Sequence, residues 1–241
     1  MIKIRLRFSK TGPLRFIGHL DFLKVFQQTV ARAKLPIAYS QGFNPHMLMS
    51  FALPLPLGMT SLGDYADIVL EAGMPEDEII SRLNAYSPEG LTVTGARGFS
   101  GQGAAAVVAA ADYAFPAELL PEGKAHEIIQ NLLARESIVI PKKTKSGVKD
   151  TDIRPDILDI KISDECRNIP EISAIESENQ NCVLMRLVAG SARFLNPLIV
   201  AGLLLGHDAD PSAITRVELY RKTAGSDNFD RLVPLYEAAA G

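Results

Sequence analysis

The stretch KTGPLRFIGHLDFLKVFQQTVARAKLPIAYSQGFNPHMLMSF, residues 10–51, reads as a loop, a helix, a second loop and the start of a strand. The helix is predicted from about His19 to Leu35. Apolar residues recur there at three or four positions and form one stripe: Leu20, Leu23, Phe26, Val30 and Ala33. Glycine and proline interrupt the chain in both loops, and each loop ends near a histidine, His19 or His46.

The residues around this stretch predict four strands and a second helix. Ile2 to Ser9 alternates apolar and polar residues, which is typical of a half-buried strand. Strands are predicted over His46 to Leu53 and Tyr65 to Glu71, then a helix that opens at Pro75 and a strand over Gly90 to Ala96. The order strand–helix–strand–strand–helix–strand is that of a ferredoxin-like unit with an antiparallel sheet.

The second half of the chain repeats this order loosely, and Asn196-Pro197 and Gly206 predict the start and end of a helix that runs to Leu205. A glycine- and alanine-rich stretch over residues 95–111 predicts a domain boundary near residue 105. We therefore predict an α+β protein of tandem ferredoxin-like (βαββαβ) units with antiparallel sheets. The predicted domains are residues 1–105, with a basic face, and residues 106–223, followed by a tail over residues 224–241.

Basic residues are concentrated at the N-terminus. Residues 1–50 contain eight lysines and arginines and one acid, whereas the whole chain of 241 residues has a formal net charge of −3. Such asymmetry indicates an anionic partner for the basic part, or acidic neighbours in the fold that balance it. The cations of the first strand share one face, which is either a track for phosphates or a solvated face.

The candidate binding residues are of two kinds. Those for nucleic acid or another anion are basic residues and one histidine of the N-terminal segment, and lysines of a basic hairpin near residues 142–149: Lys3, Arg5, Arg7, Lys10, Arg15, His19, Lys142, Lys143 and Lys145. His19 opens the predicted helix, where the helix dipole favours phosphate, although a capping or packing role explains it too. Those for a protein partner are Phe43, Asn44, His46 and Arg154.

Neither a metal nor a cofactor is expected. The two cysteines, Cys166 and Cys182, have no metal-ligand spacing and suggest no disulfide framework. His19 and His46 stand at opposite ends of a helix of roughly 25 Å, which argues against one shared metal or catalytic site. The cysteine usage predicts a reducing, cytoplasmic setting, and no apolar run approaches the length of a membrane span.

Several motifs carry a resemblance to a known family. They are IRLRFSKTGPLRFIGHLD (residues 4–21), AYSQGFNPHMLMSFALPLPLG (residues 38–58), Asp64-Tyr-Ala-Asp67 and Asp152-Ile-Arg154-Pro155. Together they resemble the bacterial radical SAM-linked protein family, a domain of unknown function found beside or fused to a radical SAM enzyme. The resemblance implies a radical SAM enzyme as partner and an RNA context, but no reaction. The chain lacks the CxxxCxxC motif of a radical SAM enzyme, so it is not itself that enzyme.

We therefore predict a non-catalytic accessory protein of a radical SAM enzyme that binds RNA or another anionic substrate through its basic N-terminal segment. Two alternatives stay open. The tandem arrangement resembles RNA endonucleases of the CRISPR type, in which His19 or His46 would be the general base beside Lys10 or Arg15. Alternatively, the chain is a protein-interaction module that docks through Phe43 and the strand over Met47–Leu53.

Overall fold

The structure is a computed structural model that describes residues 1–144, 147–164, 181–223, 229 and 231–237. The predicted α+β class with a mostly antiparallel sheet is confirmed. Contacts divide the chain into unit 1, Met1–Ala109 with Arg216–Gly241, and unit 2, Ala110–Thr215. The sequence prediction drew the boundary near residue 105 and grouped residues 216–223 with the second half, whereas their contacts group them with unit 1.

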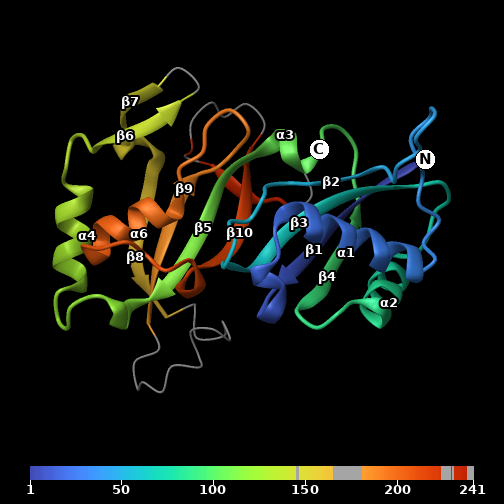
Figure 1. The fold of residues 1–241 in the computed structure, drawn as a ribbon, viewed down its shortest axis with the longest axis horizontal. Coiled ribbons are helices and arrows are strands. Elements are labelled where there is room, and N and C mark those ends of the chain that lie inside the picture. The colour runs from blue at the N-terminus through green and yellow to red at the C-terminus, as the bar shows by residue number, and fades with distance from the viewer. Residues whose placement is uncertain (145–146, 165–180, 224–228, 230, 238–241) are drawn as a thin grey trace. The chain divides into compact units, whose positions relative to one another are not determined.

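Unit 1 is built on a sheet with the strand order β4-β1-β3-β10, in which β2 also pairs with β3 and β11 with β10 (Figure 1). Its strands are β1 (Ile2–Lys10), β2 (Met49–Phe51), β3 (Thr60–Leu70), β4 (Leu91–Gly98), β10 (Thr215–Lys222) and β11 (Leu232–Pro234). Its helices are α1 (His19–Arg32), α2 (Glu76–Tyr86) and the short α3 (Ala104–Val107), with a 3-10 turn η1 (Gly12–Phe16).

The core of unit 1 lies between the sheet and the helices α1 and α2, which cover one of its faces (Figure 1). Strand alternation points the apolar residues of β1 into this core: Ile4, Leu6 and Phe8. Phe8 packs on Phe22 and Phe26 of α1, with ring centroids 5.7 and 5.2 Å apart. The same alternation turns the basic residues of β1 to the opposite face of the sheet, which we call the second face: Lys3, Arg5 and Arg7.

In its described residues, unit 2 contains the strand order β5-β9-β8 and the helices α4 and α6, and buried apolar side chains lie on the strands and on the helices. The elements are β5 (Val108–Pro116), η2 (Ala117–Leu119), α4 (Ala125–Leu133), η3 (Arg154–Asp156), β8 (Ile157–Ser163), β9 (Cys182–Val188), α6 (Pro197–Leu205) and η5 (Pro211–Ala213). A separate hairpin is formed by β6 (Val139–Thr144) and β7 (Gly147–Asp152). Cys182 is disulfide-bonded. This corrects the expectation from the sequence, because cysteine spacing does not show which side chains meet in the fold.

Local sequence sets the bounds of α6. The side chain of Asn196 accepts a hydrogen bond from the Leu198 amide at 3.1 Å, and Pro197 occupies the first helical position. Gly206 then ends the helix in the left-handed conformation, with φ of 77°. The predicted start and end of this helix are confirmed.

Candidate functional site

The second face of the unit 1 sheet carries an array of polar side chains. The strand register places Arg5 opposite both Asp67 of β3 and Arg97 of β4, and it places Arg7 opposite Tyr65. Residues that face each other across neighbouring strands point to the same side of a sheet, so these side chains share the second face. Residues 99–107 and the C-terminal segment, which we define as residues 232–237, lie against it. These segments therefore cover the part of the second face around Arg5.

Arg5 is held by a buried carboxylate. Its Nε and Nη2 atoms donate to the two oxygens of Asp67 at 2.8 and 3.0 Å, and each side chain is only 8% exposed. Asp67 also accepts a hydrogen bond from the Ala104 amide at 2.5 Å. The Arg5 guanidinium lies over the ring of Phe99, 4.5 Å from its centroid. Arg5 therefore tethers residues 99–104 to the sheet.

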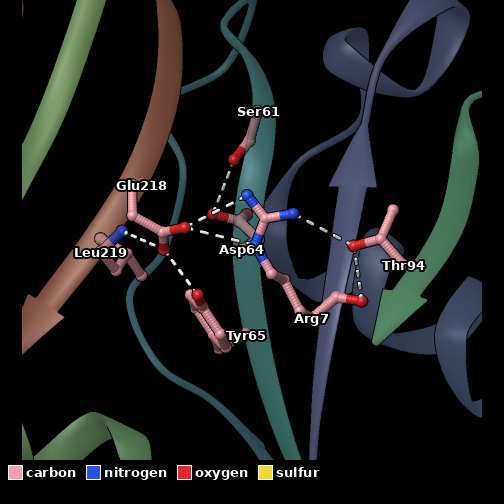
Figure 2. A network of polar contacts seen from close by, with 7 residues as sticks. All are labelled: Arg7, Ser61, Asp64, Tyr65, Thr94, Glu218 and Leu219. Atoms are coloured by element: carbon pink, nitrogen blue, oxygen red, sulfur yellow. Dashed lines mark hydrogen bonds and ion pairs between the residues drawn. The ribbon is translucent and has the colours of Figure 1, made fainter. Parts of the chain in front are cut away.

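Arg7 belongs to a second network, drawn in Figure 2. Its Nε and Nη2 atoms donate to Glu218 Oε2 of β10 at 3.3 and 3.1 Å. The Tyr65 hydroxyl donates to Glu218 Oε1 at 2.6 Å, and the Leu219 amide donates to the same oxygen at 2.8 Å. Arg7 Nη1 also reaches the Thr94 hydroxyl at 3.3 Å. Glu218 thus joins β10 to β1 and β3.

Burial raises the pKa of Glu218 above its ordinary value, although the Tyr65 hydrogen bond and the Arg7 charge lower it in part. A carboxyl whose pKa is raised by folding stabilises the fold most below its unfolded pKa, and this contribution is lost as the pH rises through the folded value. We expect wild type to gain stability relative to Glu218→Gln as the pH falls from 7 toward 4. Urea unfolding of both proteins across this range measures the gap, and exposed Glu89→Gln is the control. A wild type that loses stability relative to Glu218→Gln as the pH falls would contradict the expectation.

The Asp64-Tyr-Ala-Asp67 motif forms the inner part of these networks. Asp64 pairs with Arg216, the first β10 residue of unit 1, whose side chain is fully buried. Arg216 also donates to the Leu53 carbonyl at 3.0 Å. Gly63 lets β10 approach, since a Cβ atom there would lie 2.3 Å from the Val217 carbonyl oxygen. The motif therefore fixes β3 against β10.

The other N-terminal cations predicted to bind an anion lie in different places. Lys10 is 2% exposed; its Nζ donates to the Ile17 carbonyl at 3.1 Å and lies over Phe22, and burial lowers its pKa. Lys3 donates to the Gly101 carbonyl at 3.1 Å. Arg15 stacks on Phe16, and exposed His19 meets Phe51 edge-on, with centroids 5.6 Å apart. Lys10 is thus an internal residue, and His19 remains accessible.

The predicted partner contacts differ in exposure. Phe43 is fully exposed, and Asn44 and His46 are exposed. His46 Nδ1 lies 2.8 Å from the Ser40 hydroxyl, which also accepts from the His46 amide at 3.1 Å and closes the loop. Arg154, in contrast, donates to the Leu133 carbonyl at 2.9 Å, at the end of α4. Arg154 therefore serves the fold of unit 2.

The basic hairpin predicted from the lysines is present as β6 and β7, and Lys142 faces Lys149 across it. The side chain of Lys143 and the whole of Lys145 lie outside the described residues. The like charges of Lys142 and Lys149 stand directly opposite each other, which weakens the pairing of β6 with β7.

One cavity of unit 1 collects arginines from three strands. It has a volume of about 330 Å³, and Arg5 of β1, Arg97 of β4 and Arg221 of β10 line it. We call it the arginine pocket. Its other walls are residues 98–100, Gln102, Val107 and residues 235–237. The arrangement brings one predicted site residue, Arg5, together with two that the sequence reasoning did not select.

The C-terminal segment forms one wall of the arginine pocket. The guanidinium of Arg97 lies 4.9 Å from the centroid of the Tyr236 ring, and the Tyr236 hydroxyl donates to the Ala96 carbonyl at 3.2 Å. The ring rests on Gly95, where a Cβ atom would approach within 2.6 Å of it. A glycine in β4 therefore makes room for the aromatic ring beside the pocket.

The charge of the arginine pocket is incompletely balanced. Asp67 pairs with Arg5. Within the part of the chain that the structure describes, no carboxylate lies within ion-pair distance of Arg97 or Arg221. Glu237 also lines the cavity, and its side chain is exposed. The alternation of residues along β4 indicates that Arg97 points to the second face. Nothing in the sequence showed that β10 would bring Arg221 to the same cavity.

Fold and pocket together define a class: an α+β protein with an arginine-lined cavity on an antiparallel sheet. Among the described residues, no group of three or more His, Cys, Asp or Glu side chains could hold a metal ion, and no helix is long and apolar enough to span a membrane. The chain belongs to the family DUF2344, described as an uncharacterized protein conserved in bacteria, whose model matches residues 3–197. No curated protein matches the chain.

Proposed function

We propose that this protein is a non-catalytic binding protein that takes an anionic ligand in the arginine pocket. The observation that carries the proposal is the convergence of three guanidinium groups, from β1, β4 and β10, on one cavity of about 330 Å³. A guanidinium presents a planar fork of donors that matches carboxylate and phosphate oxygens. The volume lies at the lower end of the range for small-molecule sites, roughly 300–1,000 Å³.

The internal contacts of the other cations support this location. Arg7 is paired with Glu218, and Lys10 is buried, so neither offers its charge to a polymer lying along β1. The proposal therefore keeps the anionic substrate predicted from the sequence and moves it from the β1 track into the pocket. The motif resemblance adds a role as accessory to a radical SAM enzyme, with RNA as one class of anionic substrate.

A tandem ferredoxin-like fold is part of the same proposal. In unit 1 the order β4-β1-β3, with β2 against β3, is the antiparallel order of a βαββαβ unit. Along the chain, β5, α4, β8, β9, α6 and β10 repeat the succession strand–helix–strand–strand–helix–strand, with the β6–β7 hairpin inserted. These two observations support an internal duplication.

Pyrophosphate binding, measured by titration calorimetry, tests the proposed function. We expect wild type to bind, and Arg97→Gln and Arg221→Gln each to bind about tenfold or more weakly, because each loses one charge-assisted contact of roughly 1.5–3 kcal/mol. Arg82→Gln is the matched control. Arg82 lies in α2, where it pairs with Glu78 at 2.5 Å on the helix surface.

The salt dependence of binding and the unfolding midpoint of each variant make this test specific. Binding should weaken as salt rises, since ions screen the charges of the pocket. The unfolding midpoint of each variant should be recorded, so that a variant with a damaged fold is not scored as a binding defect. Absence of pyrophosphate, phosphate and RNA binding to wild type at low salt would overturn the proposed function, as would equal binding by all three variants.

A further inference from the structure

Each arginine of the pocket donates to a backbone carbonyl of the C-terminal segment, and the three carbonyls are consecutive. Arg5 Nη1 lies 3.4 Å from the Leu235 oxygen. Arg97 Nη1 lies 2.9 Å from the Tyr236 oxygen, and Arg221 Nη2 lies 3.5 Å from the Glu237 oxygen. The chain's own backbone therefore already occupies donor positions of the cavity.

These carbonyls are weak partners for the cations. The contacts of Arg5 and Arg221 are longer than the usual range of about 2.7–3.2 Å for an N–H···O hydrogen bond. A carbonyl is also neutral, whereas an anionic oxygen adds the attraction of opposite charges, and a carboxylate or phosphate can accept from two N–H groups of one guanidinium. A phosphate or carboxylate oxygen would satisfy each of these donors better than the carbonyl does.

The spacing of the three donors indicates the charge of such a ligand. Consecutive residues stand about 3.8 Å apart along a chain, so three successive carbonyls span more than one small anionic group. A single phosphate would replace one or two of them, whereas neighbouring anionic groups on one molecule could replace all three. A ligand with several anionic groups fits the pocket best.

We infer that the ligand of the arginine pocket carries two or more anionic groups and binds by replacing the carbonyls of Leu235, Tyr236 and Glu237 on Arg5, Arg97 and Arg221. This inference rests on the proposed function. It assigns the C-terminal segment a role as an internal competitor. Only molecules in which the segment is undocked can bind the ligand, so the apparent Kd equals the intrinsic Kd divided by the undocked fraction.

Displacement must break identifiable contacts of the segment. The Leu235 amide donates to the Leu219 carbonyl at 2.9 Å, next to the pairing of β11 with β10, and Leu235 is 2% exposed. The Tyr236 ring must leave Gly95 and Arg97. An anion that binds beside the docked segment would leave all of these contacts in place.

Hydrogen exchange of the full chain with and without pyrophosphate distinguishes these two modes. If the segment is displaced, the Leu235 amide exchanges faster in the bound protein, while amides of residues 98–100 and Gln102, which line the pocket outside the segment, exchange more slowly. Bound pyrophosphate with unchanged or slower exchange at Leu235 overturns this inference and leaves the proposed function standing. Failure of wild type to bind pyrophosphate, phosphate and RNA alike at low salt overturns both.

Two variants of the full chain test the competition from opposite sides. Tyr236→Ala removes the ring that rests on β4, and Gly95→Ala places a methyl group where that ring lies, so both should loosen the segment and tighten pyrophosphate binding about fivefold or more. Tyr86→Ala, an exposed tyrosine of α2, is the control and should bind as wild type does. Weaker or unchanged binding by both variants, with wild-type unfolding midpoints, contradicts the competition.

The class of ligand is tested with a series of inorganic anions. Pyrophosphate and triphosphate should bind at least about tenfold more tightly than phosphate, because they satisfy more than one arginine at once. Equal affinities for phosphate and pyrophosphate would contradict the requirement for two or more anionic groups.

Discussion

Arg216→Met is expected to destabilise the protein by about 3–5 kcal/mol, the cost of removing one partner of a buried ion pair. The Arg216 side chain is fully buried, and its Nε donates to Asp64 Oδ1 at 2.7 Å. Methionine fills a similar volume but takes the guanidinium away from the buried Asp64 carboxylate, which keeps the Ser61 hydroxyl at 2.9 Å and the nearby charge of Lys10. The carbonyls of Leu53 and Pro54 lose their donor as well.

Urea unfolding followed by circular dichroism measures this loss. Arg82→Met is the matched control: it breaks a half-exposed pair with Glu78 and should cost no more than about 1 kcal/mol. The double variant Arg216→Met with Asp64→Leu removes both charges of the pair and should recover part of the lost stability, because the Asp64 carboxylate is then no longer buried without its arginine. Equal effects of Arg216→Met and Arg82→Met would show that the buried pair does not hold β10 to β3.

The sequence predicted the fold class well because periodicity and end signals are local. Alternation over Ile2–Ser9 predicted β1, and Asn196-Pro197 with Gly206 predicted the bounds of α6. The strand predicted from His46 is shorter, Met49–Phe51, because pairing with β3 sets its length and the residues before it form the loop closed by Ser40 and His46. Bounds set by pairing with distant strands were the least predictable.

The candidate site was harder to predict for the same reason. Strand alternation correctly put Arg5 and Arg7 on one face, but it carried no information on what covers that face. Their partners Asp67 and Glu218 are 62 and 211 residues away along the chain. The segment predicted as a tail supplies Tyr236, which packs against β4. Burial and ion pairing of these cations thus depend on contacts between distant parts of the sequence.

Gly63→Ala is expected to cost about 3 kcal/mol or more, at or above the upper end of the usual range for overpacking. The added methyl carbon would lie 2.3 Å from the Val217 carbonyl oxygen and 3.0 Å from the Glu218 Cα atom. Both are backbone atoms, so no side-chain rotation can relieve the overlap, and β10 must move away from β3. That movement would also stretch the bonds of Arg216 to Asp64 and of Glu218 to Tyr65.

Gly98→Ala in β4 is the matched control, because a Cβ atom there meets nothing within 4 Å. It should change the free energy of unfolding by no more than about 0.5–1 kcal/mol. The expected direction is stabilising, because alanine has less conformational freedom than glycine in the unfolded chain. Urea unfolding of both variants, together with Gly63→Ala in the Arg216→Met background, completes the test. Because both changes loosen the same contact between β3 and β10, their combined cost should be smaller than the sum of the single costs. Fully additive costs would mean that the two residues stabilise separate parts of unit 1.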